Sequence, residues 1–218
     1  MTIPHSLCGR VDLDRYPLHD LDSIQGKALI EACQTNLSAT GVLTLDGFIP
    51  AEEAKRLVCD ARLRKPLSHR MKGMFCPYSD DLSEEDDLRL PDDHPRRLKL
   101  PASHRFIAGD CIPFDNSLQQ IYRDQQFIEF VTTALGIEAI YPISDALGGI
   151  NILIYESGDA NGWHFDATEF VISIMLQAAT CGGQYQYIPD MRSEKDENLG
   201  AIADRMLNPD MEHGIRQI

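Results

Sequence analysis

His164 and Asp166 are the residues with the clearest chemical potential, and they lie in the segment 162–166, which reads GWHFD. In an extended chain, side chains two positions apart point to the same side, so the imidazole and the carboxylate would project together while Phe165 points away. One imidazole and one carboxylate are two of the three ligands of a 2-His-1-carboxylate iron site, which leaves positions open for a co-substrate and O2. The spacing alone also fits a hydrogen-bonded surface pair, so the flanking elements must decide.

Segments with strand-like patterns flank this pair. Residues 149–155 and 184–188 are typical of strands, and the mostly apolar run 170–177 is typical of a buried strand. Two ligands placed between such strands match the way a jelly-roll presents side chains at its open end. This context favours a metal site over a surface pair.

Asn151 and Tyr155 are the candidate residues for binding a co-substrate or substrate. Their separation is even, so they share one face of the predicted strand before the His–Asp pair. The alternative interpretation is that both are ordinary polar residues of a strand.

Helical patterns dominate the N-terminal half and recur near the C-terminus. The first predicted helix is capped by Asp22 or Ser23 and ends before Gly41, and the second begins at Pro50. A third is capped by Asn116 or Ser117, a fourth ends at Gly136, and a fifth occupies 194–207 behind a Ser193–Asp196 capping box. A strand is predicted at 42–45. Because helices come first and most strands later, the pattern indicates an α+β fold.

Two segments have little periodicity, residues 1–20 and residues 66–113, and we interpret them as an irregular lead-in and a long loop region. Eight acidic residues crowd positions 79–93, which predicts a solvated loop, with an active-site lid or a seat for a cationic substrate as the alternative. Three histidines of the longer segment are interpreted as loop hydrogen-bonding residues: His69, His94 and His104.

The composition of the 218 residues excludes several classes of partner. Asp and Glu number 34 against 20 Lys and Arg, a net charge of −14, which disfavours nucleic acid and anionic membrane surfaces. The sequence shows no membrane-spanning apolar run and no C-x-x-C pair among its six cysteines, and the residues at its start predict no signal peptide. The expected setting is therefore the reduced cytoplasm. Cys33 and Cys59 are predicted to be core residues.

The order of these motifs resembles the Fe(II)/2-oxoglutarate-dependent oxygenases, and within them the branch of free amino-acid halogenases and hydroxylases. The resemblance rests on 149–155, GWHFD at 162–166 and GGQYQYIP at 182–189, together with LTLDGFI at 43–49, HPRR at 94–97 and DALGGIN at 145–151. It covers about residues 40–190 and is densest at 145–190. It implies a single domain over 1–218 with a double-stranded β-helix (jelly-roll) core and N-terminal helices.

The resemblance implies that His164 and Asp166 bind Fe(II), with 2-oxoglutarate as co-substrate and O2 as oxidant. The halogenases of this branch carry a small residue in place of the carboxylate, so Asp166 implies hydroxylation rather than chlorination. The implied substrate is a small molecule such as a free amino acid. A homo-oligomer is left open.

The sequence departs from the family pattern after residue 207. The family places a distal iron-binding His and a 2-oxoglutarate-binding Arg on later strands, and only His213 and Arg216 are candidates here, with no strand expected around them. The C-terminal part of the jelly-roll is therefore expected to be incomplete. Two alternatives follow: a truncated, inactive relative acting as a binding or oligomerising module, and a hydrolase that uses another metal at the same residues.

Overall fold

The computed structural model describes residues 7–78, 89–193, 195–208 and 214–217. Contacts along the chain divide it into two compact units. The first unit comprises Met1–His69 and Phe106–Ile152, and the second comprises Arg70–Arg105 and Leu153–Ile218. Within the described part of the chain, no helix is both long and apolar enough to cross a membrane.

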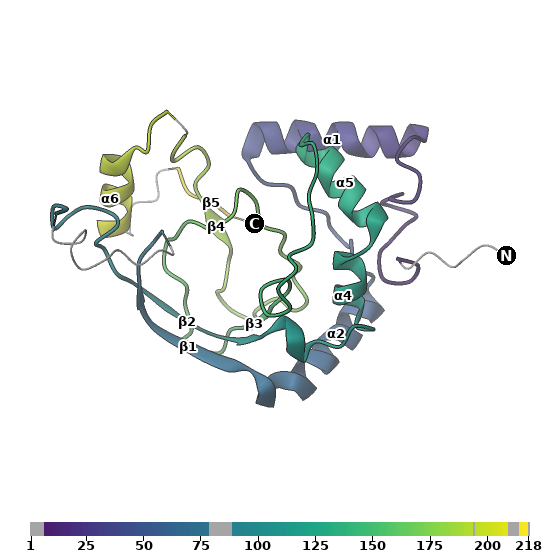
Figure 1. Cartoon of the computed structure of the whole chain (residues 1–218), viewed down its shortest axis with the longest axis horizontal. Helices are drawn as coiled ribbons and strands as arrows, with labels where there is room; N and C mark the ends of the chain where they lie inside the picture. Colours follow the sequence, from purple (N-terminus) through teal and green to yellow (C-terminus); the bar gives the residue numbers. More distant parts are fainter. Residues whose placement is uncertain (1–6, 79–88, 194, 209–213, 218) are drawn as a thin grey trace. The chain divides into compact units, whose positions relative to one another are not determined.

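The first unit is helical (Figure 1), with α1 (Ile24–Thr40), α2 (Ala51–Arg64), α4 (Ser117–Tyr122) and α5 (Gln125–Leu135). The helix boundaries predicted for this unit are confirmed. The Ser23 hydroxyl accepts a hydrogen bond from the Gly26 N–H at 3.0 Å and caps α1, and Asn116 caps α4. Helix α1 ends at Gly41, whose φ of 75° suits a residue without a Cβ.

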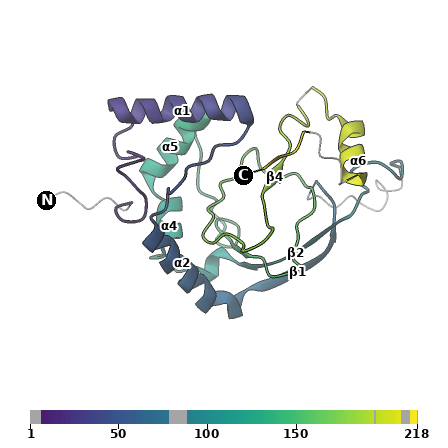
Figure 2. The same ribbon diagram turned by 180° about the vertical axis from the view of Figure 1, so that it is seen from behind.

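Helices α1 and α5 lie side by side in both views of the ribbon (Figure 2). The predicted apolar stripe of α5 is buried, including Phe127 and Phe130 at 7% and 3% exposure. Cys33 is buried as predicted, whereas the prediction for Cys59 was wrong because α2 turns Leu57 and Ala61 inward and leaves Cys59 exposed.

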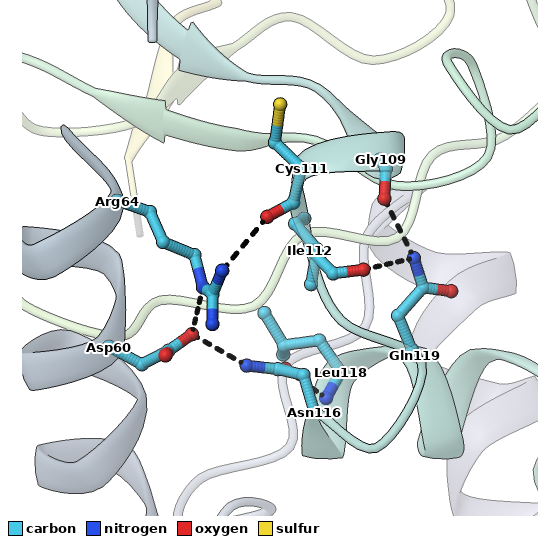
Figure 3. Close-up of polar contacts among 8 residues, drawn as sticks. All are labelled: Asp60, Arg64, Gly109, Cys111, Ile112, Asn116, Leu118 and Gln119. Carbon is cyan, nitrogen blue, oxygen red and sulfur yellow. Dashed lines mark hydrogen bonds and ion pairs between the residues drawn. The ribbon is translucent and has the colours of Figure 1, made fainter. Parts of the chain in front are cut away.

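A polar network ties the segment before α4 to α2 (Figure 3). The carboxylate of Asp60 accepts hydrogen bonds from Arg64 Nε and Asn116 Nδ2, both at 2.9 Å. Arg64 also donates to the carbonyl oxygen of Cys111 at 3.2 Å. These hydrogen bonds give the polar groups partners and hold the segment before α4 against α2, although no sheet pairing is involved.

A small sheet is formed mainly by the second unit. It contains β1 (His69–Phe75), β2 (Leu100–Ile107) and β3 (Ile152–Ile154) in the order β1-β2-β3. The first two strands lie inside residues 66–113, so the prediction of a long irregular region was wrong there. Strand β2 does alternate in burial, but one of its inward positions is His104, which breaks the apolar alternation that indicates a strand.

The predicted strands are shorter than expected or do not form. Residues 149–155 contribute only β3, and 184–188 contribute only β4 (Gln186–Tyr187), which pairs with β5 (Arg216–Gln217) in antiparallel register. Residues 42–45 and 170–177 form no strand. Val171, Ile172 and Met175 are exposed by 54%, 48% and 70%, so the predicted burial of this run was wrong. An apolar run becomes a buried strand only where a neighbouring strand accepts its backbone hydrogen bonds.

The last helix, α6 (Leu199–Leu207), begins later than predicted. The Ser193 hydroxyl does accept from the Asp196 N–H at 3.2 Å, but these residues form a local bridge rather than a helix start. The described residues thus combine helices with a small sheet and contain no closed barrel, and the jelly-roll core stays a prediction.

Candidate functional site

His164 and Asp166 lie close together, as their spacing predicts. His164 Nε2 is 3.6 Å from Asp166 Oδ1, and the two side chains are 40% and 49% exposed. The pair is therefore accessible from solvent, and its two potential ligand atoms face each other.

The second ring nitrogen of His164, Nδ1, is held by the backbone. Nδ1 lies 2.7 Å from the carbonyl oxygen of Gly162. A carbonyl oxygen can only accept, so Nδ1 carries a proton, and Nε2 is the ring nitrogen that faces the carboxylate. Histidines that bind metals are held in this way, with one nitrogen donating to a fixed acceptor and the other free to coordinate.

The pair fits two coordination positions of one metal ion. Two donors about 2.1 Å from a shared ion lie about 3 Å apart when they are at right angles, so the observed 3.6 Å requires only a small side-chain movement. Among the residues that the structure describes, no group of three or more His, Cys, Asp and Glu side chains converges on a common point. The candidate for the third donor, His213, lies outside the described residues.

Phe165, between the two potential ligands, anchors this segment through its ring and its backbone N–H. Its ring centroid is 5.0 Å from that of Tyr78, and the guanidinium of Arg192 lies 4.2 Å above the Phe165 ring. The Phe165 N–H donates to the carbonyl oxygen of Pro77 at 2.7 Å. The guanidinium of Arg96 covers the Tyr78 ring at 4.5 Å. Each such contact contributes roughly 0.5–1 kcal/mol, and together they fix the residue between the two ligands.

Tyr155 and Asn151, the predicted co-substrate residues, fall in different units. The Tyr155 ring lies 5.5 Å from the ring of His104, and burial raises the pKa of its hydroxyl. Asn151 precedes β3 in the first unit, and its side chain is exposed. Their shared role stays a prediction.

His104 is a residue whose importance sequence reasoning missed. It was interpreted as a loop residue, but it sits on β2 with 8% exposure, and its Nδ1 atom has no hydrogen-bond partner within the described part of the chain. Burial lowers the pKa of His104, with smaller electrostatic effects from Asp159, Arg70 and His164. The signal available in the sequence was the alternation of residue types along β2, and the polar histidine at position 104 interrupted it.

Tyr185 also belongs to the surroundings of the pair. The pKa of its hydroxyl is raised by burial and then by the negative charge of Asp166, so the two side chains are within electrostatic reach. The Tyr185 ring lies 6.3 Å from that of Tyr187, on β4. The spacing of these tyrosines fits one face of the strand predicted at 184–188, although nothing in the spacing linked them to Asp166.

Comparisons with protein-family models, with curated proteins and with solved structures found no match to this chain.

Proposed function

We propose that this protein is an Fe(II)- and 2-oxoglutarate-dependent dioxygenase that hydroxylates a small molecule, such as a free amino acid. The observation that carries the proposal is the orientation of His164. Its Nδ1 donates to the Gly162 carbonyl oxygen, and its Nε2 faces Asp166 Oδ1 across 3.6 Å. An imidazole with one nitrogen held by a fixed acceptor and the other beside a carboxylate is the arrangement typical of metal-binding histidines.

His164 Nε2 and Asp166 Oδ1 would hold the metal, which when bound supplies O2 activation coupled to oxidative decarboxylation of 2-oxoglutarate. Asp166 keeps the carboxylate at the position where the related halogenases have a small residue, and this favours hydroxylation. Phe165, anchored on Tyr78, would keep both ligands on one side of the segment.

The C-terminal residues give additional support. Arg216 on β5 pairs with Tyr187 on β4, although no strand was expected around Arg216. Strand β4 directly follows Tyr185, which lies within electrostatic reach of Asp166. Arg216 is therefore the candidate for binding a 2-oxoglutarate carboxylate, since a guanidinium can bind a carboxylate through two parallel hydrogen bonds.

A second function, a binding or oligomerising module without catalysis, is favoured by a different feature. Val171, Ile172 and Met175 form an exposed apolar run. Exposed apolar patches of this kind often mark sites of protein association. Under this alternative, His164 and Asp166 would be a surface pair.

The test is co-substrate turnover. The protein would be incubated aerobically with Fe(II), 2-oxoglutarate and a panel of free amino acids, and succinate and hydroxylated products would be quantified. We expect succinate formation that is lost in His164→Ala and Asp166→Ala and retained in the control His19→Ala, an exposed histidine of the first unit. Metal analysis of the purified protein separates the hydrolase alternative. Equal succinate formation in wild type and His164→Ala would contradict the proposal.

A further inference from the structure

We propose that the ion pair between Arg70 and Asp159 is a positioning device for His164. The pair holds the turn before the ligand segment in one register against β2, and this register places the carbonyl oxygen that fixes the tautomer of His164. The inference rests on the proposed metal-binding function and names the residues on which that site depends.

The ion pair joins β1 to the turn in a two-point contact. Arg70 Nη1 donates to Asp159 Oδ2 at 2.7 Å, and Arg70 Nη2 donates to Oδ1. The Asp159 side chain is only 3% exposed although it lies in a turn, whereas Arg70 is 34% exposed. A guanidinium that meets a carboxylate through two parallel hydrogen bonds fixes orientation as well as distance.

Asp159 also organises its own turn. Its Oδ2 accepts a hydrogen bond from the Glu156 N–H at 2.8 Å. The hydrogen bonds from Arg70 first, and then this backbone contact, hold the pKa of Asp159 well below the usual range of a carboxyl group. The carboxylate is therefore ionised throughout the neutral range, and it stays available to both donors.

The three residues after Asp159 are attached to β2 one after another. The Ser103 N–H donates to the carbonyl oxygen of Ala160 at 2.7 Å, Asn161 bridges Ala102, and the Gly162 N–H donates to the carbonyl oxygen of Pro101 at 2.9 Å. The Gly162 carbonyl then accepts from His164 Nδ1 at 2.7 Å. The path from the ion pair to the imidazole is a continuous run of short, mostly backbone hydrogen bonds.

A second ion pair at the same turn supplies the matched control. Arg105 Nε lies 3.4 Å from Glu156 Oε2, in a single contact between side chains that are 33% and 43% exposed. Such exposed single contacts contribute little, about 0–1 kcal/mol. Removing the Glu156 carboxylate changes the charge of the turn by the same amount as removing that of Asp159, and it leaves the two-point contact intact.

The experiment compares Asp159→Asn, Arg70→Lys and the control Glu156→Gln in the full chain. Lysine keeps the positive charge of Arg70 but cannot form the two-point contact, so Arg70→Lys tests geometry with little risk to folding. Two quantities are measured: the tautomer of His164 from imidazole nitrogen NMR shifts of the metal-free protein at about pH 8, where imidazoles are generally neutral, and the dissociation constant for Co(II). Thermal unfolding of each variant verifies that it is folded.

We expect wild type and Glu156→Gln to show His164 with the proton on Nδ1. The two variants that break the Arg70–Asp159 contact, Asp159→Asn and Arg70→Lys, are called the clamp variants, and we expect both to show mixed tautomers. We also expect Co(II) affinity to fall by about tenfold or more in the clamp variants, the loss typical when a group that orients a metal ligand is removed.

The two readouts separate failure of this inference from failure of the proposed function. If wild type binds Co(II) through His164 and both clamp variants keep the wild-type tautomer and affinity, the positioning role is overturned and the metal site stands. If wild type shows no His164-dependent binding of Co(II), the proposed function fails. The tautomer comparison then decides the positioning role by itself, and an Nδ1 proton unchanged in both clamp variants overturns it.

Discussion

Helix α5 and residues 170–177 both contain runs of apolar residues, yet the first is buried and the second is largely exposed. In α5 the stripe from Phe127 to Ala134 is buried, whereas Val171 and Met175 are more than half exposed. A helix satisfies its backbone hydrogen bonds within itself and needs only a surface to pack on. A strand needs a neighbour at a defined register, which its own sequence does not contain. The four predictions below test this difference, in order of decreasing expected effect.

The largest expected effect comes from truncating one side chain in each run. Phe130→Ala should lower the free energy of unfolding by about 3–5 kcal/mol, because it opens a cavity in a packed core. Met175→Ala should change it by less than about 0.5 kcal/mol, since the side chain is exposed by 70%. Urea unfolding followed by circular dichroism measures both. A cost near that of Phe130→Ala for Met175→Ala would mean that residues 170–177 are packed as the buried strand that the sequence predicts.

A matched pair of glycines tests how closely the ligand segment approaches β2. A Cβ at Gly162 would lie 2.8 Å from Leu100 Cβ and 3.0 Å from the carbonyl oxygen of Pro101, so Gly162→Ala should cost about 1–3 kcal/mol. Gly200→Ala in α6 meets no atom within 4 Å and should stabilise the protein by up to about 1 kcal/mol. Thermal unfolding compares the two variants. A neutral Gly162→Ala would contradict the close approach.

Two serines were predicted to cap helices, and the structure confirms Ser23 but not Ser193. Ser23→Ala should cost about 1 kcal/mol, because the Ser23 hydroxyl caps α1 at 3.0 Å from the Gly26 nitrogen. Ser193→Ala should cost less than half of that, since the Ser193 hydroxyl accepts from the Asp196 N–H in a local bridge and not at a helix start. Equal costs in urea unfolding would show that Ser193 caps a helix after all.

A smaller effect is expected from pH. Burial lowers the pKa of His104 in the folded protein, so between that pKa and about 6.5 the unfolded chain binds more protons than the folded one. The free energy of unfolding should therefore be independent of His104 titration above about pH 6.5, and it should fall as the pH decreases from there toward the folded-state pKa of His104. The neighbours Asp159, Arg70 and His164 act electrostatically on this group.

His104→Leu is the variant for this comparison, and it should flatten the dependence of stability on pH relative to wild type. A His104→Leu profile that is as steep as wild type below about pH 6.5 would show that His104 is not the group responsible.

The sequence predicted local features well and long-range ones poorly. Ser23, Asn116 and Gly41 act within one helical turn, and all three boundaries were confirmed. The approach of His164 to Asp166 was also predictable, because it depends only on the geometry of neighbouring residues. The contact of Arg70 with Asp159 joins residues 89 positions apart, and no local pattern indicates it. The same applies to the burial of His104, which depends on the pairing of strands that the sequence did not reveal.

The most direct test of the proposed function is anaerobic addition of Fe(II) and 2-oxoglutarate, with the visible metal-to-ligand charge-transfer band recorded for wild type and variants. This band requires both Fe(II) and co-substrate bound at one site. We predict a band in wild type and in Glu156→Gln, and its loss in His164→Ala and Asp166→Ala. No band in wild type, or an unchanged band in His164→Ala, would contradict the proposed function.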